Sequence, residues 1–285
     1  MATNRIALVT FSATNVTQTY AGVMRDALLA HGCEAQLFNV TAHASRREPL
    51  PIADFDGLLF GFPVFSDFAP SVINAWLPTL DGQGKRCALF LTYGGRTAGY
   101  AHFHTKLLLE RAGFQVLFSA EFLGRHSFNL GGWRILPDRP NEHDLAVARD
   151  YAALALERFS QDAPPVFRLQ KPFGYNRTMA WLEGQKGGAS QRWTPPGRVT
   201  DGCSMCRACE TECPAQAFDA DTGLSEPARC IGCMHCVYVC PDGVVRVGER
   251  RQDSYAEFLA FWHLTEEMMQ AKRSRIITES WQAAF

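Results

Sequence analysis

The sequence predicts an α/β protein in which a doubly wound, five-stranded parallel sheet is followed by a small, cysteine-rich α+β domain. Over the first 160 residues, short runs rich in Val, Ile, Leu and Phe alternate with helical patterns. This alternation is typical of a parallel sheet covered by helices on both faces. Eight of the ten cysteines fall within residues 203–240. The 285 residues leave room for both domains.

The apolar patterns place each element of the first domain. Strands are expected at residues 6–12, 34–40, 57–64, 86–93 and 115–123, and helices at 17–31, 71–80, 101–112 and 142–159. Four regions follow from this reading: residues 1–160, the sheet domain; 161–197, a packed linker rich in Pro and Gly; 198–250, the cysteine-rich domain; and 251–285, a C-terminal helix and tail. Apolar residues at helical spacing predict the last helix over residues 254–272, docked on the protein or on a second copy in a homodimer.

Composition and charge argue against several classes of function. A net charge of −1 provides no basic surface for nucleic acid, and no apolar run reaches the length of a membrane span. The apolar stretch at the N-terminus is too short for a signal peptide and fits a strand better, so we expect a cytoplasmic protein. No serine or cysteine nucleophile has an assignable base, which gives no support to hydrolytic chemistry. Whether the protein is an enzyme stays open.

Two cysteine runs share one spacing. They read CSMCRACETECP at residues 203–214 and CIGCMHCVYVCP at residues 230–241. The pattern C-x2-C-x2-C-x3-C-P is that of [4Fe-4S] sites, and the two copies resemble the two-cluster bacterial ferredoxins. Structural zinc usually takes separated C-x2-C pairs, and disulfides are not expected at this density without a secretory signal. Cys33 and Cys87 lie outside the runs, and we expect both to be small buried hydrophobes.

The resemblance to two-cluster ferredoxins implies the ligand sets. In that family the fourth cysteine of each run ligates the cluster of the other run. One set is then Cys203, Cys206, Cys209 and Cys240, and the other is Cys230, Cys233, Cys236 and Cys213. The two clusters would hold the repeats together. His235 lies between two of these ligands, and we expect it to face solvent rather than to tune a cluster.

Three loops follow strands at the sheet edge where ligands bind in such folds. The first, TFSATNVT, offers hydroxyls and the amides of a helix N-terminus, which attract an anion without Lys or Arg. It resembles the flavodoxin phosphate loop T/S-x-T-G-x-T, with Asn15 in place of glycine, and Asn tolerates the left-handed conformation. An ordinary helix cap is the alternative. The loop residues are Ser12, Thr14, Asn15, Val16 and Thr17.

The other two loops lie where flavodoxins hold the isoalloxazine ring of FMN. GFPVFSDFAP follows the third strand and LTYGGRTAGY the fourth. Their aromatic side chains offer a flat wall, and their glycines let the backbone approach the ring edge. The expected contacts are Pro63, Val64, Phe65, Ser66, Thr92, Tyr93, Gly94 and Gly95. His102 and His104 come next, and polar residues at the start of a helix are the simpler interpretation for both.

The order of the two parts resembles the flavodoxin/ferredoxin fusion proteins of bacteria and archaea. The resemblance implies FMN and two [4Fe-4S] clusters as cofactors, and electron transfer to or from a redox partner protein. Two alternatives stay open. The chain could be a ferredoxin-type carrier whose first domain docks without flavin, or a flavin-dependent reductase of a small organic substrate.

Overall fold

A central sheet dominates the computed structural model, which describes residues 4–184, 195–247 and 250–279. Its strand order is β2-β1-β3-β4-β5-β10. The strands are β1 (Arg5–Thr10), β2 (Glu34–Asn39), β3 (Gly57–Pro63), β4 (Arg86–Tyr93), β5 (Gln115–Leu123) and β10 (Arg275–Ile277). The first five are parallel, and their order 2-1-3-4-5 is that of flavodoxin-like folds. The predicted fold class is therefore confirmed.

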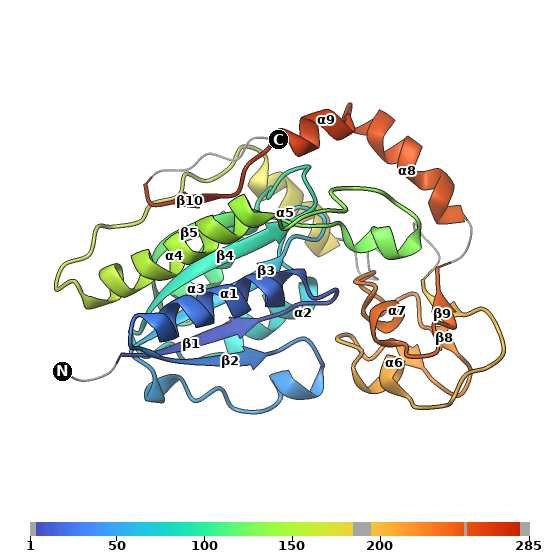
Figure 1. Ribbon diagram of the computed structural model, residues 1–285, viewed down its shortest axis with the longest axis horizontal. Helices are drawn as coiled ribbons and strands as arrows, with labels where there is room; N and C mark the ends of the chain where they lie inside the picture. Colours follow the sequence, from blue (N-terminus) through green and yellow to red (C-terminus); the bar gives the residue numbers. More distant parts are fainter. Residues whose placement is uncertain (1–3, 185–194, 248–249, 280–285) are drawn as a thin grey trace.

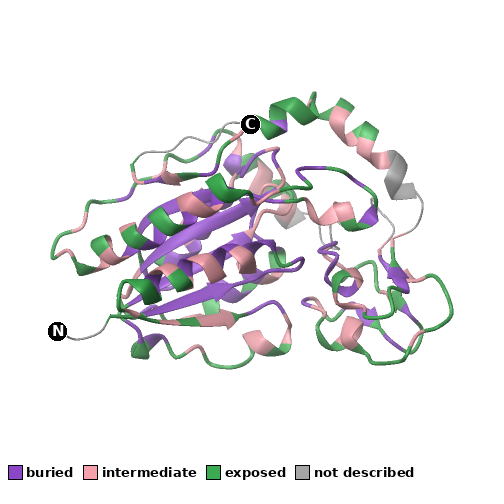
Figure 2. Cartoon of the chain, viewed as in Figure 1, coloured by how far each residue is buried: buried purple, intermediate pink, exposed green. Residues whose placement is uncertain are grey.

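Helices cover both faces of the sheet (Figure 1). They are α1 (Val16–Ala30) and α4 (Glu142–Ser160) on one face, and α2 (Ser71–Trp76), the 3-10 turn η3 (Leu77–Thr79) and α3 (Ala101–Arg111) on the other. Alternate strand residues serve the two layers: Ile6 and Leu8 of β1 pack with α1 and α4, whereas Ala7 and Val9 pack with α2 and α3. Figure 2 shows the buried strands between these partly exposed helices.

The chain returns to the sheet at its C-terminal end. Two helices, α8 (Arg250–Phe261) and α9 (Glu266–Gln270), replace the single helix expected over residues 254–272. The break has a local cause, because His263 is left-handed (φ 51°) and the Thr265 side chain accepts from Met268 N to cap α9. β10 then pairs antiparallel with β5, an edge strand that the apolar pattern did not predict.

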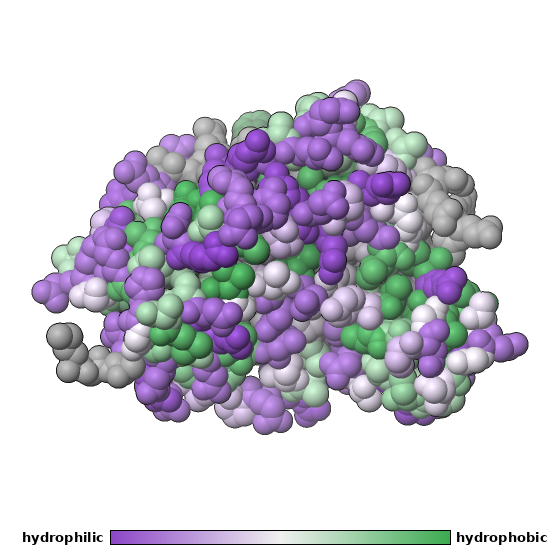
Figure 3. Space-filling view, viewed as in Figure 1, coloured by the Kyte–Doolittle hydropathy of each residue, from purple (hydrophilic) through white to green (hydrophobic). Residues whose placement is uncertain are grey.

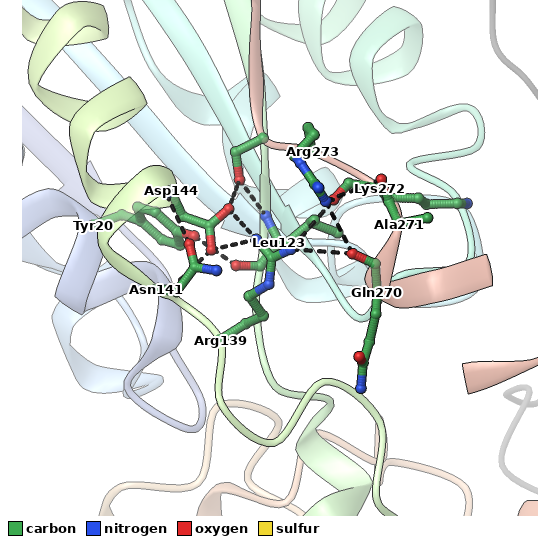
Figure 4. A network of polar contacts seen from close by, with 10 residues as sticks. Tyr20, Leu123, Arg139, Asn141, Asp144, Gln270, Ala271, Lys272 and Arg273 are labelled. Atoms are coloured by element: carbon green, nitrogen blue, oxygen red, sulfur yellow. Dashed lines mark hydrogen bonds and ion pairs between the residues drawn. The ribbon is translucent and has the colours of Figure 1, made fainter. Parts of the chain in front are cut away.

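A buried carboxylate ties this C-terminal segment to the sheet (Figure 4). Asp144 accepts hydrogen bonds from Ser274 Oγ and from Arg139 Nη1, each at 2.6 Å. Ser274 Oγ in turn accepts from Leu123 N at the end of β5 (2.9 Å), and Arg139 Nη2 donates to the Lys272 carbonyl (3.3 Å). Because the buried charge is paired and hydrogen-bonded, the network can hold α9 and β10 beside the strand ends.

The stretch expected as a linker contains a helix. α5 (Tyr175–Gly184) lies on the α3 side of the sheet, where the Tyr175 hydroxyl and His104 Nδ1 are 2.7 Å apart. Phe167, before this helix, is buried in the core shared with α2 and α3. Aromatic side chains therefore fix this part of the chain to the sheet domain.

The cysteine-rich region, residues 195–247, lies beyond the carboxyl ends of the parallel strands (Figure 1). Its elements are β6 (Gly197–Arg198), α6 (Ala208–Thr211), β7 (Phe218–Asp219), β8 (Leu224–Ser225), α7 (His235–Val239) and β9 (Val245–Arg246). β6 pairs with β9 and β7 with β8, both antiparallel. Its small core contains Phe218, Cys236, Val244 and Val245, and Figure 3 shows apolar side chains gathered on the visible face of this region.

Candidate functional site

The two cysteine runs share one backbone conformation. Left-handed residues occupy the same two positions in each run: Met205 (φ 54°) and Arg207 (60°) in the first, Gly232 (70°) and Met234 (65°) in the second. A short helix begins directly after each second position, at α6 and α7. Left-handed residues within a turn produce the concave backbone that accommodates anionic groups. The sequence repeat is thus also a structural repeat.

One group of four thiols gathers around the first run. The pKa of Cys209 is raised to about 11, mainly by burial and also by the charges of Cys240, Cys203 and Cys206. Cys240 belongs to the second run, so the neighbours cross between the runs. All four thiols are free of disulfides, and four thiols around a concave loop fit the ligand set of a [4Fe-4S] cluster.

A second group of four gathers around the second run. Burial raises the pKa of Cys236, and the charges of Cys233, Cys230 and Cys213 raise it further. Here the crossing residue is Cys213, from the first run. The other two cysteines lie in the sheet domain: Cys87 is buried, as expected, whereas Cys33 is only partly buried.

The two loops differ in their surroundings. We call residues 203–209 the outer loop and residues 230–236 the inner loop. In the outer loop Cys206 is exposed, whereas Cys233 of the inner loop is buried against the sheet domain. His235 of the inner loop is also buried, and its Nδ1 donates to the Ala13 carbonyl at 2.7 Å. The prediction that His235 faces solvent is wrong, because the loop between β1 and α1 of the sheet domain covers it.

A cavity of about 780 Å³ lies at the carboxyl ends of the strands, within the usual size range of ligand sites. Most of the expected flavin contacts line it: Ser12, Thr14, Val16, Thr17, Pro63, Val64, Phe65, Ser66, Thr92, Tyr93 and Gly94. Two of them do not. Asn15 is exposed at the start of α1, and a Cβ on Gly95 would point toward Leu136 and Met269, each at 3.0 Å.

The loop between β1 and α1 presents a row of backbone donors. In the described part of the chain, the amides of residues 13–17 donate to no protein acceptor, whereas Gln18 N donates to Ser12 Oγ (3.0 Å). The Ser12 amide is used elsewhere, because it donates to Thr41 Oγ1 (2.7 Å). Asn15 is left-handed (φ 67°), as expected, and makes no side-chain cap. Such amides at the start of a 15-residue helix attract an anion.

Contacts between the three predicted loops fix the shape of the cavity. The hydroxyls of Thr17 and Thr92 are 2.7 Å apart, which joins the first loop to the third. Val64 N donates to the Thr92 carbonyl (2.8 Å), which joins the second loop to the third. At Gly94 a Cβ would lie 2.6 Å from His126 Cδ2, so only glycine fits this position without displacing the histidine.

Sequence reasoning missed four parts of the cavity wall. The additional lining includes Arg125, His126 and Phe128 after β5; Met179, Trp181 and Leu182 of α5; Phe258 of α8 and Trp262 directly after this helix; and Cys230, Ile231 and Gly232 of the inner loop. The loop after β5 could have been found, because it also follows the carboxyl end of a parallel strand. The other parts reach the cavity through tertiary packing and leave no local signal in the sequence.

Both histidines after the third loop are buried. His102 Nδ1 lies 2.6 Å from Ser119 Oγ, inside the sheet domain and away from the cavity lining. His104 lines the cavity, and burial lowers its pKa to about 4. His104 is therefore neutral near pH 7 and offers a polar, uncharged group at the cavity wall.

Comparison with known proteins identifies the cysteine-rich region. Residues 196–241 match the family described as the 4Fe-4S dicluster domain. Over 59 residues the chain is 37% identical to Ferredoxin-2 of Chlorobaculum tepidum, covering 95% of that protein and 18% of this chain. This region belongs to the dicluster ferredoxins. With the strand order described above, the chain joins a flavodoxin-like fold to a dicluster ferredoxin region, and we call it the fusion protein.

Solved structures similar to the fusion protein over its sheet domain include two flavodoxins. One, from the domain Archaea, is 14% identical (TM-score 0.42; 55% of this chain, 99% of that chain). Flavodoxin 1 from Bacillus cereus is 13% identical (TM-score 0.41; 54% and 98%). Rubredoxin oxygen:oxidoreductase from Desulfovibrio gigas is 18% identical (TM-score 0.42; 55% and 37%).

A flavodoxin-like fold joined to a dicluster ferredoxin indicates electron transfer as the function of the fusion protein. The described helices include none with the length and hydrophobicity needed to cross a bilayer.

Proposed function

We propose that the fusion protein passes electrons between FMN, bound in the cavity, and two [4Fe-4S] clusters, and on to or from a redox partner protein. One observation carries this proposal: the inner loop, through Cys230, Ile231 and Gly232, lines the same cavity as the expected flavin contacts. A flavin held there would adjoin the nearer cluster without an intervening layer of protein. Bound flavin exchanges electrons singly or in pairs, whereas each cluster takes one at a time.

Each group of four thiols serves one cluster in this proposal. The inner cluster is ligated by Cys230, Cys233, Cys236 and Cys213, and the outer cluster by Cys203, Cys206, Cys209 and Cys240. Cluster assembly must deprotonate all eight thiols, and bound iron would lower the pKa values that burial and neighbouring thiols raise at Cys209 and Cys236. Because each cluster takes a ligand from both runs, the pair also fixes the two repeats to each other.

The residues of the sheet domain fit FMN in two ways. The free amides of residues 13–17, together with the Thr14 hydroxyl, provide donors for the phosphate at the start of α1. Phe65 and Tyr93 on the cavity wall provide apolar surface for the ring. Asn15 supports the site through its left-handed backbone, and its side chain is not required.

Anaerobic purification followed by iron, sulfide and flavin analysis tests both cofactor assignments. We expect about eight irons, about eight sulfides and about one FMN per chain. A protein without FMN that also fails to take up added FMN would contradict the proposal and support the carrier without flavin. Stopped-flow reduction is the functional test, and a flavin that never exchanges electrons with the clusters would exclude the proposed path.

A second candidate is a flavin-dependent reductase of a small organic substrate. The observation favouring it is that the cavity extends past the flavin loops to Trp181 and Trp262. Arg96 stacks over the Trp262 ring (4.1 Å from its centroid) and forms an ion pair with Asp67, so the wall is both aromatic and polar. Turnover with small electron acceptors in the absence of any protein partner would support this candidate, and strict dependence on a partner would count against it.

A further inference from the structure

The two cysteine loops carry different residues at equivalent positions. In the outer loop Ser204 follows the first cysteine, and Asp242 follows the Cys-Pro of the second run. The Asp242 carboxylate accepts hydrogen bonds from Ser204 N (2.8 Å) and Ser204 Oγ (2.7 Å). The equivalent residues of the inner loop are Ile231 and Ala215, which carry no charge. The Asp242 carboxylate therefore lies beside the outer loop, and the equivalent position for the inner loop carries no carboxylate.

The inner thiols instead have a guanidinium beside them, supplied by the sheet domain. Arg46, from the turn η1 (Ala44–Arg46) after β2, donates through Nη1 to the carbonyls of Val40 (2.7 Å) and Thr41 (2.8 Å). Its Nη2 donates to the carbonyl of Pro214, directly after the inner ligand Cys213. The side chain thus connects the sheet domain to the backbone directly after Cys213, the cysteine of the first run that lies among the inner thiols.

The charge of Arg46 is directed at the inner thiols. Burial lowers the pKa of Arg46, and the charges of Cys213 and Cys233 oppose that shift. Its hydrogen-bond partners are neutral carbonyls. Among the ion pairs between described residues, none involves Arg46. The positive charge is therefore partly buried and is not neutralised by a carboxylate.

We propose that Arg46 raises the reduction potential of the inner cluster above that of the outer cluster. The proposal rests on the two-cluster function given above. Reduction adds one negative charge to a cluster, and a nearby guanidinium stabilises that charge more strongly when water is partly excluded. In a half-reduced protein the electron then resides mainly on the inner cluster, beside the cavity. Arg46 stabilises the negative charge of the reduced inner cluster through space and ligates no iron.

A redox titration of the full chain, followed by electron paramagnetic resonance, tests the proposal. We expect two reduction waves in the native protein. In Arg46→Gln the higher midpoint potential shifts down toward the lower one, which stays in place. Arg46→Lys keeps the charge and should retain most of the separation. Arg47→Gln, which removes the exposed neighbouring charge, should leave both waves unchanged.

Three outcomes would overturn the proposal. In Arg46→Gln, the higher midpoint potential could stay unchanged, or both midpoint potentials could shift equally. Alternatively, Arg46→Lys could lose the separation of the two potentials as fully as Arg46→Gln, which would indicate that the side chain has a structural role independent of its charge. Iron and sulfide analysis of each variant separates this inference from the proposed function. Fewer than two clusters in the native protein would refute the function, whereas two clusters without an effect of Arg46 would refute only the inference.

Discussion

The inner and outer cysteine loops start from one sequence pattern and one backbone, yet they occupy different environments. Both have left-handed residues at the same two positions and a short helix after the second. The outer loop is partly solvent-exposed and has Asp242 beside it, whereas the inner loop is buried against the sheet domain with Arg46 and the loop between β1 and α1 beside it. The repeated cysteine pattern therefore forms two loops of similar conformation, and the surrounding residues differentiate them.

The largest expected effect is the loss of a cluster when the cysteine that each group takes from the other run is replaced. Cys213→Ala is expected to abolish the inner cluster, although this cysteine lies in the first run, and Cys240→Ala to abolish the outer cluster. Each variant should lose about half of the iron, since a thiolate ligand is missing from one cubane. Iron analysis and electron paramagnetic resonance measure the loss. If Cys213→Ala instead removed the cluster of its own run, the crossed assignment would be wrong.

Exchanging Gly232 and Met205, which hold the first left-handed position of the inner and outer loops, should have the next largest effect on cluster stability and FMN affinity. Gly232→Met places a side chain on a left-handed residue at the cavity wall, at a cost of about 1–2 kcal/mol. The inner cluster should then be lost to an iron chelator about tenfold faster, and FMN should bind more weakly. The matched exchange Met205→Gly in the outer loop should leave FMN affinity unchanged. Equal effects of the two variants on FMN would contradict the distinction between the loops.

His235→Ala makes the inner loop resemble the outer one, where Ala208 holds the equivalent position. The variant loses the hydrogen bond from His235 Nδ1 to the Ala13 carbonyl (2.7 Å), a contribution of about 1 kcal/mol. FMN affinity measured by fluorescence titration should fall by about fivefold. Ala208→Ser, in the outer loop, serves as the control without this contact. An unchanged affinity in His235→Ala would show that the contact does not support the phosphate loop.

Asp242→Asn should have the smallest effect. The substitution removes a negative charge beside the outer thiols while leaving an oxygen that can still accept from Ser204. The lower of the two midpoint potentials should rise slightly, by less than the shift in Arg46→Gln, because the exposed carboxylate is screened by water and salt. The shift should shrink further at high ionic strength. If the higher midpoint potential shifted instead, Asp242 would act on the inner cluster, which would contradict the prediction.

Local patterns predicted the parts of the molecule whose signal lies in adjacent residues. The five parallel strands appear within one or two residues of their expected bounds, because short apolar runs between helical patterns leave few other folds. The cysteine spacing likewise predicted the dicluster ferredoxin region. The left-handed conformation expected of Asn15 is also observed (φ 67°), so this turn needs a left-handed residue but not glycine, whereas phosphate binding by the loop stays a prediction.

Contacts between distant residues could not be predicted. Arg46 lies 168 positions before Pro214, and nothing near either residue indicates their hydrogen bond. The same holds for His235, whose partner Ala13 is 222 positions away, so a solvent-facing side chain was the natural but wrong expectation. α5 and α8 reach the cavity through aromatic side chains that the sequence identifies only as apolar. The proposed electrostatic difference between the clusters rests on the contact of Arg46 with Pro214.

Because the inner loop lines the cavity, the proposed inner cluster lies between the flavin and the outer cluster. Stopped-flow reduction of two variants, each with one cluster removed, tests it most directly: Cys206→Ala lacks the outer cluster and Cys236→Ala lacks the inner one. We predict that exchange between flavin and the remaining cluster stays fast in Cys206→Ala and becomes much slower in Cys236→Ala. Equal rates in the two variants, or faster exchange in Cys236→Ala, would contradict this arrangement.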